Sequence, residues 1–199
     1  MTEEIKSNIT KLELSSDLYP FNLSLRIQTF ENEADYNKFI KNCEKLVRGC
    51  LEYRLWTNYI TDVLQIQSCA ITEEKSDQCS TEIHHHPVTL FSVVKSLVNE
   101  KLENEQPFCS FDICTKAIEL HFSNFVGFTV LIKSVHEKFH NGFLNIPRSL
   151  IKGNYTSYLN EYSKYLDEDE LEIINSRLSI TESNCNSSVD DYPRTRKAA

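Results

Sequence analysis

Glycine is scarce in this chain, accounting for only four of its 199 residues. Nucleotide-binding proteins cradle phosphates with loops that need several glycines at fixed positions. Neither a Walker motif nor a G-x-G-x-x-G sequence occurs here. The scarcity of glycine therefore excludes both of these classes of nucleotide-binding protein.

Long apolar runs are absent as well. No stretch of about 18 apolar residues occurs that could cross a membrane as a helix. The first four residues, Met-Thr-Glu-Glu, contain no apolar signal core. We therefore expect a cytoplasmic protein without a membrane partner.

Cysteine is present, but not in a zinc-finger pattern. The seven cysteines are irregularly spaced, and no C-x-x-C sequence occurs. A four-cysteine zinc site is therefore excluded. An odd number of scattered cysteines in a chain with no secretion signal is typical of reduced thiols in a cytosolic protein.

Acidic residues outnumber basic ones by 29 to 21, which gives a formal net charge of -8. That balance argues against a protein that coats nucleic acid, because neutralising phosphates requires a basic face. An enzyme that concentrates a metal and a few cations in one cleft remains possible. With 40% hydrophobic residues the chain can bury a core. We expect one domain over 1–180 and a polar, disordered tail over 181–199.

The hydrophobic pattern predicts an α+β fold. Period-two alternation predicts an N-terminal β-hairpin within 8–30 and a second hairpin over 65–86, which joins strands 65–72 and 79–86. An apolar run predicts a further strand at 126–132. Spacings of three and four predict helices at 33–64 (one helix, or two broken near Gly49), 88–101, 110–123, 134–141, 148–166 and 168–178.

Five of the six histidines fall in two short groups. The first group is Ile83-His84-His85-His86-Pro87, at the end of a predicted strand. The second is His136-Glu137-Lys138-Phe139-His140, on a predicted helix. Histidines four residues apart share one helix face, so both rings can reach one ion. Adjacent histidines on a strand point to opposite faces, so one can bind an ion while its neighbour faces a substrate.

The order of strand, His-His, strand and His-x-x-x-His helix resembles the ββα-metal finger of the HNH nuclease superfamily. The resemblance is to its histidine-rich branch and to small phage-encoded HNH-like proteins. The finger would be formed by about 65–87 and 125–147, with a helical insertion at 88–124. The implied fold is this finger embedded in a mainly helical domain.

The resemblance also implies roles for the histidines. His84, His136 and His140 would bind the metal, and His85 would be the general base that activates water. A second registration remains open, in which His85 is the ligand and His86 the base. His121 is interpreted as a structural or surface residue, or as outer support for the site.

The chain departs from the HNH pattern at one position. An asparagine that commonly stands nine residues before the first helix histidine, where it braces the base, is replaced by Gly127. Another residue would then orient the base, or turnover would be poor. Asn124 and Asn141 are nearby candidates, although neither is in register.

The resemblance implies a metal-dependent endonuclease that hydrolyses phosphodiester bonds in nucleic acid, with DNA as the expected substrate. Three imidazoles favour one zinc ion, with nickel, manganese or magnesium as alternatives. The protein would act in the host cytoplasm if it is phage-encoded. The alternative function is a catalytically weak or inactive HNH-like protein that binds a protein partner through its acidic surface.

Overall fold

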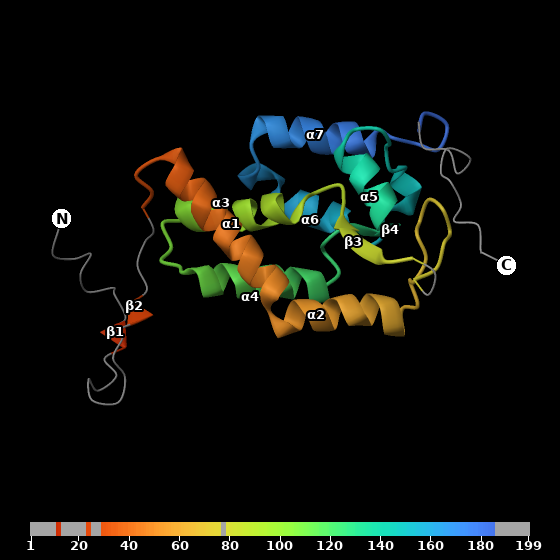
Figure 1. Ribbon diagram of the computed structural model, residues 1–199. Helices are drawn as coiled ribbons and strands as arrows, with labels where there is room; N and C mark the ends of the chain where they lie inside the picture. Colours follow the sequence, from red (N-terminus) through yellow and green to blue (C-terminus); the bar gives the residue numbers. More distant parts are fainter. Residues whose placement is uncertain (1–10, 13–22, 25–28, 77–78, 186–199) are drawn as a thin grey trace.

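The computed structural model describes residues 11–12, 23–24, 29–76 and 79–185. In this part of the chain the fold is α+β and mostly helical, as the pattern predicted (Figure 1). Strand β1 (Lys11–Leu12) pairs antiparallel with β2 (Leu23–Ser24), within the predicted N-terminal hairpin. Most of the rest of that hairpin lies outside the described residues.

The long periodic segment after residue 32 forms two α-helices. Helix α1 (Glu33–Gly49) begins where the Asn32 side chain accepts a hydrogen bond from the Asp35 amide. It ends at Cys50, whose backbone is extended, and α2 (Leu51–Asn58) starts directly afterwards. A π-helical turn, η2 (Tyr59–Val63), completes the segment. Of the two alternatives, the break near Gly49 is therefore the one that the structure shows.

The predicted hairpin over 65–86 is wrong. Residues 65–72 form no strand but enter a tight turn, with a single bridge between Ser68 and Lys75. Strand β3 (Thr81–His85) instead pairs antiparallel with β4 (Phe128–Ile132). All five residues of β4 are buried apolar or hydroxyl side chains, so β4 offers β3 a far more apolar partner than the polar segment 65–72 does.

The two-stranded ribbon of β3 and β4 lies between α5 (Lys133–His140) and α2 (Figure 1). Its register sets His84 opposite Thr129 and His85 opposite Phe128. Because side chains alternate along a strand, His84 and His85 point to opposite faces. The α5 face and the α2 face of the ribbon therefore each receive one histidine.

The remaining helices match the predicted ones closely. Two of them connect β3 to β4, so the ribbon pairs strands from either side of a helical insertion. The helix predicted at 148–166 is split into three shorter pieces. The elements are α3 (Leu90–Glu103), α4 (Ser110–Phe122), η3 (Arg148–Leu150), α6 (Tyr155–Tyr162), η4 (Ser163–Tyr165) and α7 (Glu168–Leu178).

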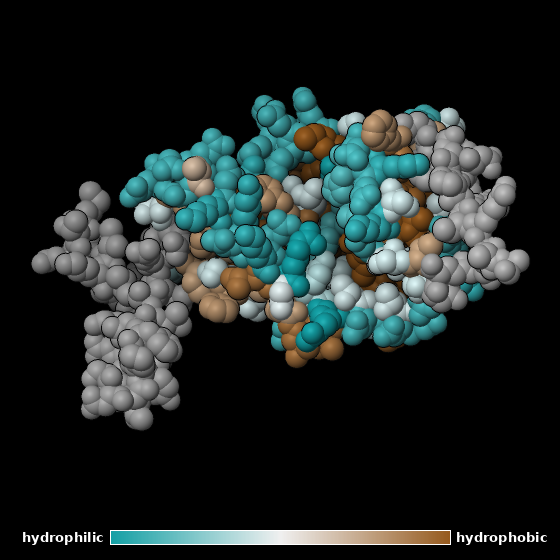
Figure 2. Space-filling view, in the orientation of Figure 1, coloured by the Kyte–Doolittle hydropathy of each residue, from teal (hydrophilic) through white to brown (hydrophobic). Residues whose placement is uncertain are grey.

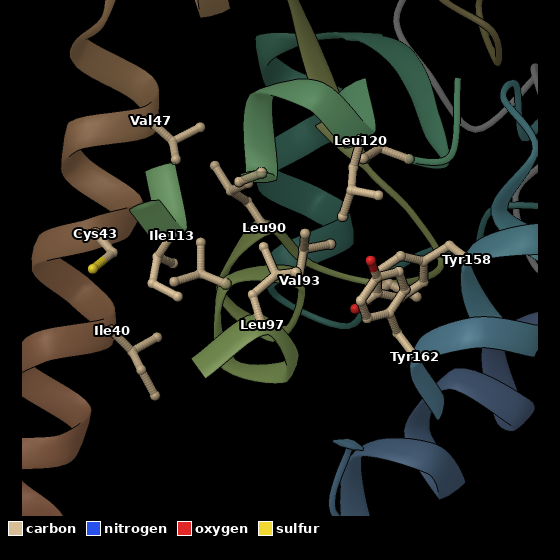
Figure 3. Packing of buried hydrophobic residues seen from close by; sticks show 14 of the residues in the cluster. Ile40, Cys43, Val47, Leu90, Val93, Leu97, Ile113, Leu120, Tyr158 and Tyr162 are labelled. Carbon is tan, nitrogen blue, oxygen red and sulfur yellow. The ribbon is translucent and has the colours of Figure 1, made fainter. Parts of the chain in front are cut away.

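Helix α3 is at the centre of the main core (Figure 3). Its buried side chains pack against α1, α4 and α6, where Tyr158 and Tyr162 stack with ring centroids 5.1 Å apart. A second, smaller cluster lies on the α5 side of the ribbon; its buried members are Cys69, Ile71, Leu131, Ile132, Val135, Leu144 and Ile146. The ribbon therefore separates two apolar cores.

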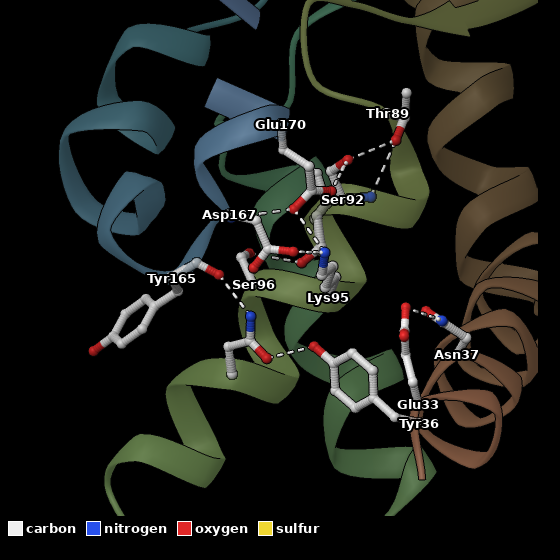
Figure 4. A network of polar contacts seen from close by, with 12 residues as sticks. Glu33, Tyr36, Asn37, Thr89, Ser92, Lys95, Ser96, Tyr165, Asp167 and Glu170 are labelled. Atoms are coloured by element: carbon white, nitrogen blue, oxygen red, sulfur yellow. Dashed lines mark hydrogen bonds and ion pairs between the residues drawn. The ribbon is translucent and has the colours of Figure 1, made fainter. Parts of the chain in front are cut away.

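A network of hydrogen bonds and ion pairs connects α3 to the start of α7 (Figure 4). Thr89 caps α3 by accepting a hydrogen bond from the Ser92 amide. Ser92 in turn donates to Glu170 at 2.8 Å, and Lys95 pairs with both Glu170 and Asp167. These contacts fix the N-terminal end of α3, which follows the histidine strand after only four residues.

The expected tail begins with ordered contacts. Residues 181–185 form a turn in which Glu182 accepts a hydrogen bond from Ser149 at 2.8 Å. The Cys185 thiol donates to the Asn145 carbonyl at 3.2 Å. The rest of the predicted tail, residues 186–199, lies outside the described residues.

Gly127 lies where two backbone segments meet. A Cβ atom built on it would come within 2.3 Å of the His86 carbonyl oxygen and within 2.9 Å of the Tyr155 side chain. His86 also donates its amide hydrogen to the Gly127 carbonyl at 3.0 Å. The position therefore excludes any side chain, including the asparagine that HNH proteins carry there.

Replacing Gly127 with alanine should destabilise the fold by about 1–3 kcal/mol or more, because backbone must shift to make room for the methyl group. Gly49, a helical glycine with no atom within 4 Å of its would-be Cβ, is the matched control. Gly49→Ala should stabilise the protein by about 0.5–1 kcal/mol. Urea unfolding of both variants measures the difference, and equal effects would contradict the close approach at Gly127.

Candidate metal centre

Three histidine side chains converge on the α5 face of the ribbon. His84 comes from β3, and His136 and His140 come from one side of α5. His136 Nε2 lies 2.9 Å from His84 Nδ1 and 2.9 Å from His140 Nε2. One nitrogen from each ring lies within 4.8 Å of the other two. Since metal–nitrogen bonds are about 2 Å long, this spacing is geometrically suitable for one shared ion.

Glu82 orients the central ring of this group. It stands two residues before His84, so its side chain is on the same face of β3. Its carboxylate accepts a hydrogen bond from His136 Nδ1 at 2.5 Å. Because a carboxylate can only accept, His136 carries a hydrogen on Nδ1, and in the neutral form of the ring the lone pair of Nε2 is then directed toward the other two rings. Metal-binding histidines commonly have such an outer carboxylate partner.

His85 occupies the opposite face of the ribbon. Its ring is nearly parallel to those of Tyr53 and Trp56, at centroid distances of 6.1 and 6.0 Å. Its Nε2 lies 3.0 Å from Nε2 of His121 on α4. Although the residue is only 5% exposed, it lines the same pocket as the three converging histidines.

That pocket has a volume of about 200 Å³ and reaches α1 as well as the ribbon. Its charged lining residues are Glu44 and Arg48, which form an ion pair at 2.9 Å. A neighbouring pocket of about 440 Å³ shares Arg48 and His136 and continues along the polar side of α2. The candidate ligands, the candidate base and one cation therefore border a single hollow.

His86 does not line either of these pockets. It is 1% exposed, and its ring lies 5.5 Å from that of Phe139. Within the described part of the chain, both of its ring nitrogens are buried without a hydrogen-bond partner. The structure thus places His84, rather than His85, beside the two α5 histidines. The alternative assignment, with His85 as the ligand and His86 as the base, therefore does not match the positions of these side chains.

Burial keeps these rings neutral. Burial and, to a smaller extent, the neighbouring His136 lower the pKa of His84 to about 2. Burial also lowers the pKa of His86 to about 3 and that of His121 to about 4, and it holds the pKa of His85 well below 6.5. Neutral imidazole is the form that can bind a metal or accept a proton.

The substitutes considered for the HNH asparagine lie elsewhere. Asn124 sits in the turn after α4 with a left-handed backbone (φ 61°), and Asn141 caps the end of α5. The side chain that reaches His85 is His121, which the sequence favoured as a structural or surface residue. It is in fact buried against Trp56, with ring centroids 4.6 Å apart.

Sequence reasoning missed two residues of the site. Glu82 carried a usable signal, because a carboxylate two residues before His84 must share its strand face. Arg48 carried none, since it comes from a helix that meets the histidines only through the tertiary fold. The structure assigns both to the surroundings of the three converging rings.

Acidification should destabilise the protein. The pKa values of His85, His86 and His121 lie below 6.5 in the fold, so the unfolded chain holds more protons between about pH 6.5 and 4. Stability present above pH 6.5 is therefore lost as the pH falls through this window. At about 1.4 kcal/mol per pH unit for each ring, the three together should remove about 4 kcal/mol by pH 5.5. Urea unfolding with a chelator, from pH 7.5 to 5.5, measures this loss.

The variant His121→Gln serves as the control, because it removes one buried titratable ring and should abolish about a third of the loss that the three rings contribute. A free energy of unfolding that stays constant from pH 7.5 to 5.5 would show that these rings are not held neutral by the fold.

Comparison with known proteins identifies a family for this chain, but it finds no matching curated protein or solved structure. Residues 2–192 match a family described as bacteriophage G278-like virion proteins. No helix among the described residues has the length and apolar character needed to cross a membrane. The expectation of a phage protein is confirmed, and the match covers nearly the whole sequence. The chain therefore belongs to the bacteriophage G278-like virion protein family.

Proposed function

We propose that this protein is a metal-dependent endonuclease of the HNH type that hydrolyses phosphodiester bonds in DNA. The ββα-metal finger would consist of β3, β4 and α5, with α3 and α4 inserted between its two strands. One observation carries the proposal: His84, His136 and His140 converge in a pocket that His85 and Arg48 also line.

The donor set fits a borderline divalent ion. Three imidazole ligands favour zinc, nickel or manganese over calcium, which prefers oxygen ligands. Glu82 holds the His136 ring with its Nε2 lone pair directed at the centre. When bound by these three rings, the ion would supply Lewis-acid stabilisation of charge on a phosphate.

The protein groups around the ion would do the remaining work. His85 is the proposed general base, since it borders the pocket and a neutral imidazole can take a proton from the attacking water. Arg48 would contact a phosphate oxygen, and Glu44 holds its guanidinium in place. Among the residues that the structure describes, Arg48 is the only lysine or arginine that lines these two pockets.

This scarcity of cations shapes the expected binding. A site with one arginine contacts few phosphates, so nucleic-acid affinity should depend on the metal and fall only shallowly with salt. The net charge of -8 agrees with such local binding rather than with a broad basic surface. The virus particle, where nucleic acid is packed, is the proposed setting alongside the host cytoplasm.

Two substitutions separate metal binding from catalysis. His140→Ala removes one ligand, so zinc affinity should fall by roughly 100-fold or more, and metal-dependent plasmid nicking should be lost with it. His85→Ala removes no ligand, so zinc content should stay at the wild-type level while nicking falls by roughly 10²–10⁴-fold. Metal analysis and nicking with zinc, nickel, manganese or magnesium measure both effects.

Glu137→Gln is the matched control, because Glu137 is exposed on α5 between the two helix ligands. It should leave metal content and nicking unchanged. Residual nicking by the His140→Ala preparation would reveal a contaminating nuclease. A wild-type protein that binds metal tightly yet cleaves neither DNA nor RNA with any of these ions would refute the nuclease.

A second candidate function is protein binding, and a separate surface favours it. An apolar groove of about 570 Å³ lies between α1 and α4, with the highly exposed Phe111 (67%) and Phe122 (54%) along it. Glu52 and Glu119 also line it. Figure 2 shows further apolar surface where α1 meets α2. The acidic residues of the groove suit an amphipathic helix from another protein of the particle, in which basic residues lie beside the apolar face of that helix.

Particle incorporation tests this second function. In a phage lacking the endogenous protein, Phe111→Lys supplied in trans should reduce the amount recovered in purified particles at least about tenfold, because it places a charge in the groove. Phe143→Lys changes an equally exposed phenylalanine outside the groove and should be incorporated normally. So should His85→Ala. Wild-type incorporation of Phe111→Lys would exclude the groove as the docking site.

A further inference from the structure

His121 forms a hydrogen-bonded chain that ends at the proposed base. It lies on α4, within the insertion between the two strands of the ribbon, and is 2% exposed. Its Nδ1 is 2.6 Å from the Ala117 carbonyl oxygen, one helical turn earlier. Its Nε2 is 3.0 Å from His85 Nε2. Backbone, His121 and His85 are therefore linked in series.

The Ala117 carbonyl determines which ring nitrogen carries the hydrogen in His121 and, through it, in His85. A carbonyl oxygen can only accept, so His121 must carry its hydrogen on Nδ1. The neutral ring then has a lone pair on Nε2, and the partner nitrogen of His85 must donate to it. His85 consequently carries its hydrogen on Nε2, which leaves its lone pair on Nδ1.

Aromatic packing holds both rings in this arrangement. Trp56 meets His121 edge to face at 4.6 Å, and Tyr53 meets it edge to face at 5.5 Å. The same two side chains are nearly parallel to the His85 ring. Rotation of either imidazole would break a buried hydrogen bond, which costs about 1–3 kcal/mol when a polar atom is left unpaired.

We infer that His121 is a positioning residue that fixes the tautomer and the orientation of His85, with Nδ1 of His85 as the basic nitrogen. It takes the place of the asparagine that Gly127 excludes, and it comes from the inserted helix rather than from the strands. The catalytic part of this inference rests on the proposed nuclease function, whereas the tautomer follows from the contacts alone.

A purely structural role for this pair is a poor alternative. Two largely buried imidazoles bring polar ring nitrogens into an apolar core, where a buried nitrogen is costly unless it is paired. Apolar side chains would fill the same space without that cost. Burial lowers the pKa of His121 to about 4, so the ring is neutral at pH 7 and the hydrogen assignment above applies.

Nuclear magnetic resonance of the full-length, zinc-loaded protein tests the tautomer directly. The ¹⁵N shifts of the His85 ring distinguish a protonated nitrogen from an unprotonated one. We expect a protonated Nε2 and an unprotonated Nδ1 in the wild type. His121→Gln should preserve this state, because its amide can donate to Ala117 and accept from His85. His121→Phe should leave His85 as a mixture of both tautomers.

Nicking kinetics then test the positioning role. His121→Phe should lower kcat by roughly 10–100-fold, the range typical of a lost outer-shell partner, with KM and zinc content unchanged. His121→Gln should recover kcat to within a few-fold of wild type, which a merely space-filling residue would not require. Should His121→Phe fail to fold, the wild-type spectrum and His121→Gln still decide the question.

The outcomes separate this inference from the proposed function. A wild-type His85 protonated on Nδ1 overturns the inference, whether or not the protein cleaves DNA. Wild-type kcat in His121→Phe overturns the positioning role. The expected tautomer in a protein that cleaves no nucleic acid supports the His121–His85 link and refutes the nuclease.

Discussion

The alternation of side chains along β3 is the constraint on which the candidate site depends. Because successive residues of a strand face opposite ways, His84 and His85 pack against different elements, although both border one pocket. Pairing with β4 fixes which face each one takes, and a slip of one residue would exchange them. One histidine thus joins α5 and its carboxylate partner, and the other joins the aromatic rings of the main core.

Each face then fixes the hydrogens of its histidines by the same rule. On the α5 face, the Glu82 carboxylate dictates that His136 presents a lone pair to its neighbours. On the other face, the Ala117 carbonyl does the same for His121. In both cases an obligate acceptor fixes the position of one ring hydrogen in a group of contacting imidazoles. The two sets of histidines therefore have different acceptors, a carboxylate and a backbone carbonyl, but their hydrogens are fixed in the same way.

Local signals in the sequence were sufficient for the helices and for the histidine groups. Thr89 marks the start of α3, and Gly142, with a positive φ of 74°, follows the end of α5. The spacing of His136 and His140 gave their shared face. The hairpin over 65–86 was wrong because β3 pairs with a strand that follows two helices, and hydrophobic alternation carries no information about which strand is the partner. Arg48 was beyond reach for the same reason, and His121 was named as outer support for the site only as one of several interpretations.

The three converging histidines lie on two elements, β3 and α5, which differ in how extensively they pack against the rest of the protein. His84 is on a strand packed against the main core, whereas α5 has eight residues and only Val135 among them is fully buried. So short a helix has little stability of its own and can open while the rest stays folded. Local unfolding of α5 would leave the His84 ring on the strand and would move the rings of His136 and His140 away from it. An ion bound by all three would therefore act as a clasp, so that metal supply and the local order of α5 become a single equilibrium.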